Sequence, residues 1–81
     1  MRRVRPVYPK QAQQKRVHGA VVLQVVVNKD GKVDSMQVIN GNPLLARAAM
    51  DAVRQRRYKP YLRDDEAVPF ETQVTIDFRL P

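Results

Sequence analysis

Residues Phe70–Leu80, which read FETQVTIDFRL, alternate between two sets of side chains almost without exception. Alternation with a period of two over so many residues predicts a β-strand with one face on a core and the other in water. It is the last predicted element before Pro81, which raises the question of what pairs with its outer edge. The core set is Phe70, Thr72, Val74, Ile76, Phe78 and Leu80, and the solvent set is Glu71, Gln73, Thr75, Asp77 and Arg79.

The stretch AVVLQVVV, Ala20–Val27, is rich in β-branched residues and predicts another strand. Both of its faces are largely apolar, which favours a central place in a sheet. Asn28–Gly31 supplies turn residues for a hairpin. In the returning strand, Lys32–Asn40, the apolar residues are unevenly spaced, which predicts a bulge between Val33 and Met36.

Two helices are expected around these strands. Pro9–Arg16 is rich in helix formers and predicts a short polar helix. A second helix is expected to begin with Asn42 as N-cap and Pro43 in its first turn, and to run to about Arg57. Asp64–Glu66 then predicts an acidic loop before the last strand. The apolar stripe of the second helix consists of Leu45, Ala49, Ala52 and Val53.

These elements predict an α+β fold in which two helices pack on a three-stranded antiparallel sheet, in the order α-β-β-α-β. If the helical crossover passes over the central strand, the strand order is 2-1-3 and Phe70–Leu80 lies at an edge. A chain of 81 residues has room for one lean core, so residues 1–81 are expected to form a single domain.

The net charge of +7 is concentrated near the beginning of the sequence. The first 16 residues contain six basic and no acidic side chains, whereas the rest of the chain is nearly balanced. Residues 1–5 are therefore expected to form a flexible basic arm, either simply solvated or in contact with an anionic partner. The six basic residues are Arg2, Arg3, Arg5, Lys10, Lys15 and Arg16.

The residues needed for catalysis or cofactor binding are scarce. There is no cysteine, and His18 is the only histidine, so neither a catalytic triad nor a two-histidine metal site is expected. Asp64–Glu66 lacks the spacing of a calcium loop, and the three glycines are isolated. The sequence thus predicts no enzyme, no metal and no cofactor. It also contains no apolar run long enough to span a membrane and no secretory signal segment.

The predicted edge strand has few of the devices that usually protect an edge, because it has one proline at its start and no lysine. Its backbone is expected to accept an extended peptide or a second copy of the domain, unless the N-terminal segment covers it. Replacing Thr75 by proline would abolish such pairing if its N–H points outward, and would break pairing with the central strand if it points inward. Nucleic-acid binding is disfavoured, because the polar face of the strand neither stacks on bases nor attracts phosphate.

Several spaced features together resemble the C-terminal domain of TonB-type energy transducers. The similarity spans Pro6 to Leu80, and the order and spacing of its parts are more specific than any one of them. The matching features are Tyr8-Pro9, Ala12, Gly19, Asp30-Gly31-Lys32-Val33, Pro43, Ala52-Val53 and Tyr58-Lys59-Pro60.

The resemblance implies a periplasmic domain tethered to the inner membrane through a segment absent from this chain and driven by an ExbB–ExbD-like motor. Such a domain captures the TonB box of an outer-membrane transporter as a strand added to its last strand, and so powers uptake of substrates such as iron-siderophores. The expected partner-binding residues are Arg5, Pro6, Val7, Tyr8, Pro9, Glu71, Gln73, Thr75, Asp77 and Arg79.

The sequence departs from the best-known members at two places. Arg5 stands where a glutamine precedes the first helix, which would favour more acidic partners, and the frequent tryptophan near Arg56 is absent. Two alternatives stay open at this point. One is a self-associating envelope scaffold that dimerises through the edge strand, and the other is a small basic nucleic-acid-binding domain.

Overall fold

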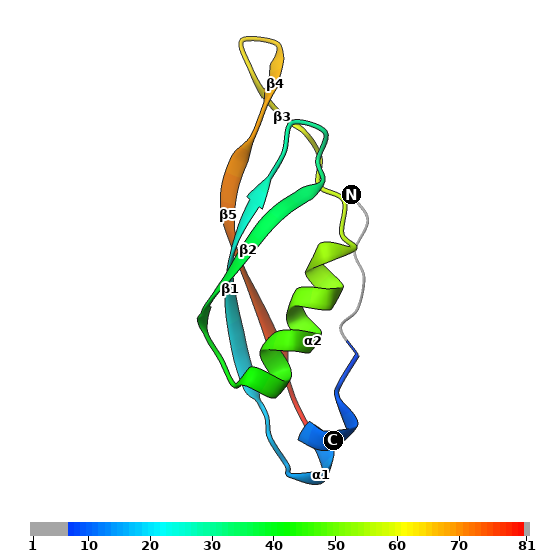
Figure 1. Ribbon diagram of the computed structural model, residues 1–81. Helices are drawn as coiled ribbons and strands as arrows, with labels where there is room; N and C mark the ends of the chain where they lie inside the picture. Colours follow the sequence, from blue (N-terminus) through cyan, green and yellow to red (C-terminus); the bar gives the residue numbers. More distant parts are fainter. Residues whose placement is uncertain (1–6, 81) are drawn as a thin grey trace.

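The computed structural model describes residues 7–80, and its main body is a three-stranded antiparallel sheet in the order β2-β1-β5. Figure 1 shows α2 lying across one face of this sheet and α1 at one end of it. The predicted α+β fold, the central valine-rich strand and the edge position of the last strand are confirmed. The elements are α1 (Lys10–Gln14), β1 (Gly19–Val27), β2 (Val33–Asn40), α2 (Pro43–Arg54), β3 (Tyr61–Arg63), β4 (Glu66–Val68) and β5 (Phe70–Phe78).

The core lies between β1 and α2. Val21, Leu23, Val25 and Val27 on one face of β1 have no exposed surface, and the other face of β1 is half-buried or exposed. Burial of a side chain of this size stabilises the fold by about 1.5–3 kcal/mol. The central strand thus supplies much of the hydrophobic stabilisation of this small domain.

The helix α2 begins as the sequence predicts. The side chain of Asn42 accepts a hydrogen bond of 2.9 Å from the backbone N–H of Leu44, and Pro43 occupies the first turn. The expected apolar stripe of this helix faces the sheet, with Leu45, Ala49, Ala52 and Val53 buried.

The end of α2 differs from the prediction, because the helix stops at Arg54 and not near Arg57. Arg57 forms an isolated β-bridge with Lys32, and the N–H of Tyr58 donates to the carbonyl oxygen of Gly31 at 2.8 Å. These contacts with the β1–β2 turn hold the chain in an extended conformation that competes with another helical turn.

The bulge predicted in β2 is present, and a second one accompanies it. Val26 pairs with Ser35 while Val27 pairs with Val33, so Asp34 is an extra residue between Val33 and Met36. A similar shift of register leaves Ile39 as an extra residue near the other end of the strand. Both insertions interrupt the ladder and bend β2.

The segment predicted as an acidic loop is instead a β-hairpin, so that prediction was wrong. Tyr61–Arg63 pairs with Glu66–Val68, and only Asp64 and Asp65 form the connection. Both aspartates have positive φ angles, 51° and 63°, as a two-residue type I′ turn requires. Figure 1 shows this hairpin extending beyond the main sheet.

Three smaller differences concern the ends of elements. The first helix begins at Lys10, with Pro9 as its N-cap, and it ends at Gln14. It ends early because Arg16 takes a positive φ of 54° and the N–H of Val17 donates to the carbonyl oxygen of Ala12 at 2.7 Å. The last strand ends at Phe78 and not at Leu80. Within residues 7–80, no helix is both long and apolar enough to cross a membrane.

Candidate functional site

The outer edge of β5 is unpaired within residues 7–80. All nine residues of β5 pair with β1, from Val27 opposite Phe70 to Gly19 opposite Phe78, and the register has no shift. No other strand of the described chain borders β5. The backbone groups on its far side are therefore open to an additional strand. The side chains of the solvent set, Glu71, Gln73, Thr75, Asp77 and Arg79, are exposed as predicted.

The turn after β1 reveals which amides of β5 point outward. The N–H of Asn28 donates to the carbonyl oxygen of Lys32 at 2.8 Å, so it points toward β2. Because successive N–H groups of a strand point to opposite sides, that of Val27 points toward β5. Alternation along the unbroken register then turns the backbone groups of Phe70 and every second residue toward β1. The residues whose N–H and C=O groups face the free edge are Glu71, Gln73, Thr75 and Asp77.

The opposite edge of the sheet is a poorer template. β2 carries two extra residues within eight, Asp34 and Ile39, whereas β5 has none in nine. Bulges twist an edge away from regular pairing and are a common protection against strand addition. Of the two edges, β5 is the one that presents an uninterrupted row of donors and acceptors.

The charged side chains on the exposed face of β5 lie near its two ends. Glu71 accepts a hydrogen bond of 3.5 Å from the side chain of Gln24, and Asp77 forms an ion pair of 2.7 Å with the exposed side chain of Arg79. Exposed pairs of this kind add little to stability. The middle of the row, Gln73 and Thr75, is neutral, so an added strand would be held mainly through its backbone.

The N-terminal segment before α1 is anchored at the C-terminal end of β5. The ring of Tyr8 packs edge-to-face on Phe78 with 5.5 Å between centroids, and its hydroxyl donates to the carbonyl oxygen of Val17. The side chain of Gln13 also donates to the carbonyl oxygen of Tyr8 at 3.2 Å. Val7, the residue before Tyr8, is 79% exposed.

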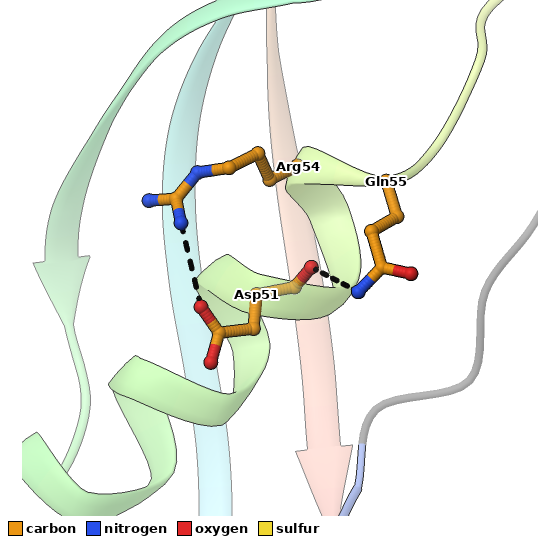
Figure 2. Close-up of polar contacts among 3 residues, drawn as sticks. All are labelled: Asp51, Arg54 and Gln55. Atoms are coloured by element: carbon orange, nitrogen blue, oxygen red, sulfur yellow. Dashed lines mark hydrogen bonds and ion pairs between the residues drawn. The ribbon is translucent and has the colours of Figure 1, made fainter.

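A shallow groove of about 680 Å³ separates this segment from α2. Asp51 and Gln55 lie on its α2 wall; Figure 2 shows Asp51 paired with Arg54 at 3.4 Å and its carbonyl oxygen accepting from the side chain of Gln55 at 3.2 Å. The groove is lined by both apolar and polar residues. Its lining consists of Val7, Pro9, Gln11, Pro43, Leu44, Arg47, Ala48, Asp51, Ala52 and Gln55.

The structure brings together only part of the predicted set. Tyr8 lies against the end of β5 that carries Asp77, whereas Glu71 is six residues away, about 20 Å along the strand. Arg5 and Pro6 lie outside the described residues. Sequence reasoning missed the groove, because its walls come from two distant segments, and it missed the hairpin, whose Asp64-Asp65 turn was the available signal.

Comparison with known proteins agrees with this geometry. Residues 4–80 match the family described as Gram-negative bacterial TonB protein C-terminal. Two curated relatives are Protein TonB of Escherichia coli (strain K12), 37% identical over 60 residues, and Protein TonB of Klebsiella pneumoniae, 36% identical over 59 residues. These alignments cover 72% and 70% of this chain. The chain spans about a quarter of the length of each relative, 25% and 24%.

Two solved structures have the same fold. The solution NMR structure of the Pseudomonas aeruginosa TonB CTD has a TM-score of 0.82 at 26% identity, covering 99% of this chain and 83% of that one. The TonB2 protein from Vibrio anguillarum has a TM-score of 0.73 at 32% identity, covering 100% of this chain and 79% of that one.

Proposed function

Because the chain belongs to the family of Gram-negative TonB C-terminal domains, we propose that it captures the TonB box of an outer-membrane transporter as a fourth strand on the free edge of β5. Family membership implies a TonB-type role and a periplasmic location. The family is one of non-enzymatic transducers, and the domain acts by binding and not by catalysis.

The observation that carries the proposal is the uninterrupted outer edge of β5. Its four outward-facing residues, Glu71, Gln73, Thr75 and Asp77, each offer one N–H and one C=O group, and all four side chains are exposed. Main-chain pairing gives affinity with little dependence on side chains. Recognition of this kind suits a domain that serves several transporters.

The same geometry bounds the affinity. Each backbone hydrogen bond contributes about 0.5–1.5 kcal/mol net, and ordering a flexible peptide offsets a large part of the sum. A dissociation constant of 1 μM corresponds to about 8 kcal/mol. We therefore expect a Kd no tighter than micromolar. A strand pulled along its axis loads all of its hydrogen bonds together, so a weak equilibrium partner still transmits force.

The N-terminal segment contributes contacts at one end of the captured strand. Val7 is exposed and Tyr8 is fixed against Phe78, so both are in position to meet a peptide that reaches the C-terminal end of β5. Pro9 faces the groove beside α2. Arg5 and Pro6 belong to the same proposed contact region, where the guanidinium would favour acidic residues of the partner.

Energy transduction requires the rest of a longer protein, since the chain covers about a quarter of its curated relatives. In the proposed arrangement, an inner-membrane tether and an ExbB–ExbD-like motor supply force derived from the proton-motive force. The domain passes this force to the transporter during uptake of substrates such as iron-siderophores. The unpaired edge also suits a second copy of this chain, so an edge-strand dimer is the alternative that the test must separate.

A peptide-binding measurement with backbone-modified controls tests the proposal. The probe is a fluorescent ten-residue synthetic peptide from the periplasmic N-terminal segment of a transporter encoded in the same genome, followed by anisotropy. Two control peptides carry N-methyl groups on every second amide. In one control the odd-numbered amides are methylated, and in the other the even-numbered amides are methylated. We expect saturable binding of the unmodified peptide with a micromolar or weaker Kd. One control should keep this affinity, and the other, in which the methylated amides are those that would donate to β5, should bind at least tenfold more weakly.

Equal binding of the two N-methylated peptides would contradict strand addition. A mass that rises with protein concentration in sedimentation, together with exclusion of all peptides, would favour the scaffold dimer. Tight binding of single-stranded DNA with a steep loss of affinity as salt increases would favour the nucleic-acid alternative.

A further inference from the structure

Pro69 lies at the junction between two strands that follow the same path. β4 ends at Val68 and β5 begins at Phe70, so this exposed proline is the only residue between them. Figure 1 shows β4 leading directly into β5. The two strands together present a potential edge of thirteen residues, Glu66–Phe78, in which Pro69 is the one residue without an N–H.

β3, which pairs with β4, and β1, which pairs with β5, lie on the same side of this long strand. The chain entering β3 is held against the β1–β2 turn by the bridge between Lys32 and Arg57 and by the 2.8 Å hydrogen bond from Tyr58 to Gly31. β3 therefore pairs with β4 on the side on which β1 pairs with β5. The outer side of β4 is continuous with the free edge of β5.

The direction of the amides in β4 agrees with this arrangement. Arg63 and Glu66 close a two-residue turn, and such a closing pair exchanges hydrogen bonds across the hairpin. The backbone groups of Glu66 and Val68 consequently face β3, and those of Ala67 and position 69 face outward. Even-numbered residues thus face inward throughout β4 and β5, and the proline occupies an outward-facing position.

Proline at this position has two effects on a strand that pairs with the edge. It withdraws the donor that would continue the ladder from Glu71 toward Ala67, and its ring occupies the edge where the added backbone would run. Proline on an edge strand is a common means of preventing pairing. The neighbouring row of donors, from Glu71 to Asp77, has no such interruption.

We infer that Pro69 terminates the peptide-accepting edge, so that a captured segment pairs with β5 alone and does not continue along β4. This inference rests on the proposed function and adds the length and position of the bound segment. From Glu71 to Asp77 the edge accommodates about seven residues, or about 23 Å of extended chain. Pro69 is a specificity-determining residue that excludes the exposed hairpin from the site.

Three synthetic peptides test the role of Pro69. One is the seven-residue centre of the transporter segment, and two are eleven-residue peptides that extend it by four native residues at either end. For the chain as it is, we expect the peptide that extends toward β4 to have a Kd within about twofold of that of the seven-residue peptide. The peptide that extends past Asp77 should bind more tightly, through the proposed contacts with the N-terminal segment. In Pro69→Thr, one extended peptide should bind about three- to tenfold more tightly, because it gains a hydrogen bond at position 69. The seven-residue peptide should bind as before.

Pro60→Thr is the matched control. Pro60 is also exposed, but it precedes β3, which lies on the side of β4 away from the free edge. The substitution should not change the dependence on peptide length. Amide hydrogen exchange supplies a second readout. Bound peptide should protect the amides of Glu71 and Thr75 from exchange in the unsubstituted chain and in Pro69→Thr. It should protect the amide of Ala67 only in Pro69→Thr, and only when the peptide is the one that extends along β4.

The outcomes separate this inference from the function on which it rests. If bound peptide protects the amides of β5 but Pro69→Thr does not change how Kd depends on peptide length, the inference about Pro69 is wrong and the proposed capture of peptides still holds. Protection of Ala67 in the unsubstituted chain would overturn the inference as well. Absence of binding by all three peptides to all variants would overturn both.

Discussion

Thr75→Pro should abolish peptide capture while the domain stays folded. The N–H of Thr75 faces the free edge near the middle of β5, so proline removes a donor to the added strand and none to β1. We expect at least a tenfold rise in Kd for the transporter peptide, from the lost hydrogen bond and the clash of the ring with the added backbone. Circular dichroism should remain that of a folded domain, with a modest decrease in thermal midpoint.

Thr72→Pro is the matched comparison. Thr72 is the same residue type three positions earlier in β5, but its N–H points to the opposite side of the strand, toward β1. The N–H of Thr72 faces Val25 in the central strand, and its side chain is half-buried. Proline there breaks the β1–β5 ladder and should destabilise the domain by about 3 kcal/mol or more, a large part of the stability of a chain this size. Equal unfolding of both variants would refute the assigned amide directions. A folded Thr75→Pro variant that binds normally would refute the site.

Gly31→Ala should cause the largest loss of stability among single-methyl additions. A Cβ atom at Gly31 would lie 2.1 Å from the carbonyl oxygen of Tyr58, and the residue has a φ of +85°. Backbone strain of about 1–3 kcal/mol adds to the displacement of a backbone atom that cannot rotate away. We expect the free energy of unfolding in urea to fall by at least about 3 kcal/mol.

Gly19→Ala separates the two contributions. Gly19 also has a positive φ, +132°, but among the described residues no neighbouring atom lies within 4 Å of the position that an added Cβ atom would take. It should lose only the backbone-strain component, about 1–3 kcal/mol. If both substitutions destabilise equally, the close contact between the β1–β2 turn and Tyr58 does not contribute as described.

The main sheet was predictable because its hydrophobic pattern has a strong physical cause. β1 is apolar on both faces and lies in the centre, whereas β5 alternates strictly and lies at an edge. The hairpin of β3 and β4 was not predicted, since three-residue strands give almost no periodicity and Asp64 and Asp65 adopt positive φ without glycine. The early end of α2 depends on tertiary contacts of Arg57 and Tyr58, which local propensity does not contain.

The candidate site was predictable in outline and not in detail. Strand length, alternation and the scarcity of protective residues indicated an open edge. The direction of its amides depends on one turn hydrogen bond, from Asn28 to Lys32, whose effect passes through β1 to β5. The outward position of Pro69 depends in turn on the unpredicted hairpin. The groove beside α2 needs the packing of Tyr8 on Phe78, which no local pattern specifies.

The most direct test of the central claim is a two-dimensional amide NMR titration of the isotope-labelled chain with the transporter peptide. Strand addition predicts shifts concentrated in Phe70–Leu80, strongest at Glu71, Gln73, Thr75 and Asp77, with smaller shifts at Val7 and Tyr8. An unchanged spectrum at millimolar peptide, from a monomeric domain, would contradict capture at this edge. Shifts confined to β2 or α2 would contradict it equally.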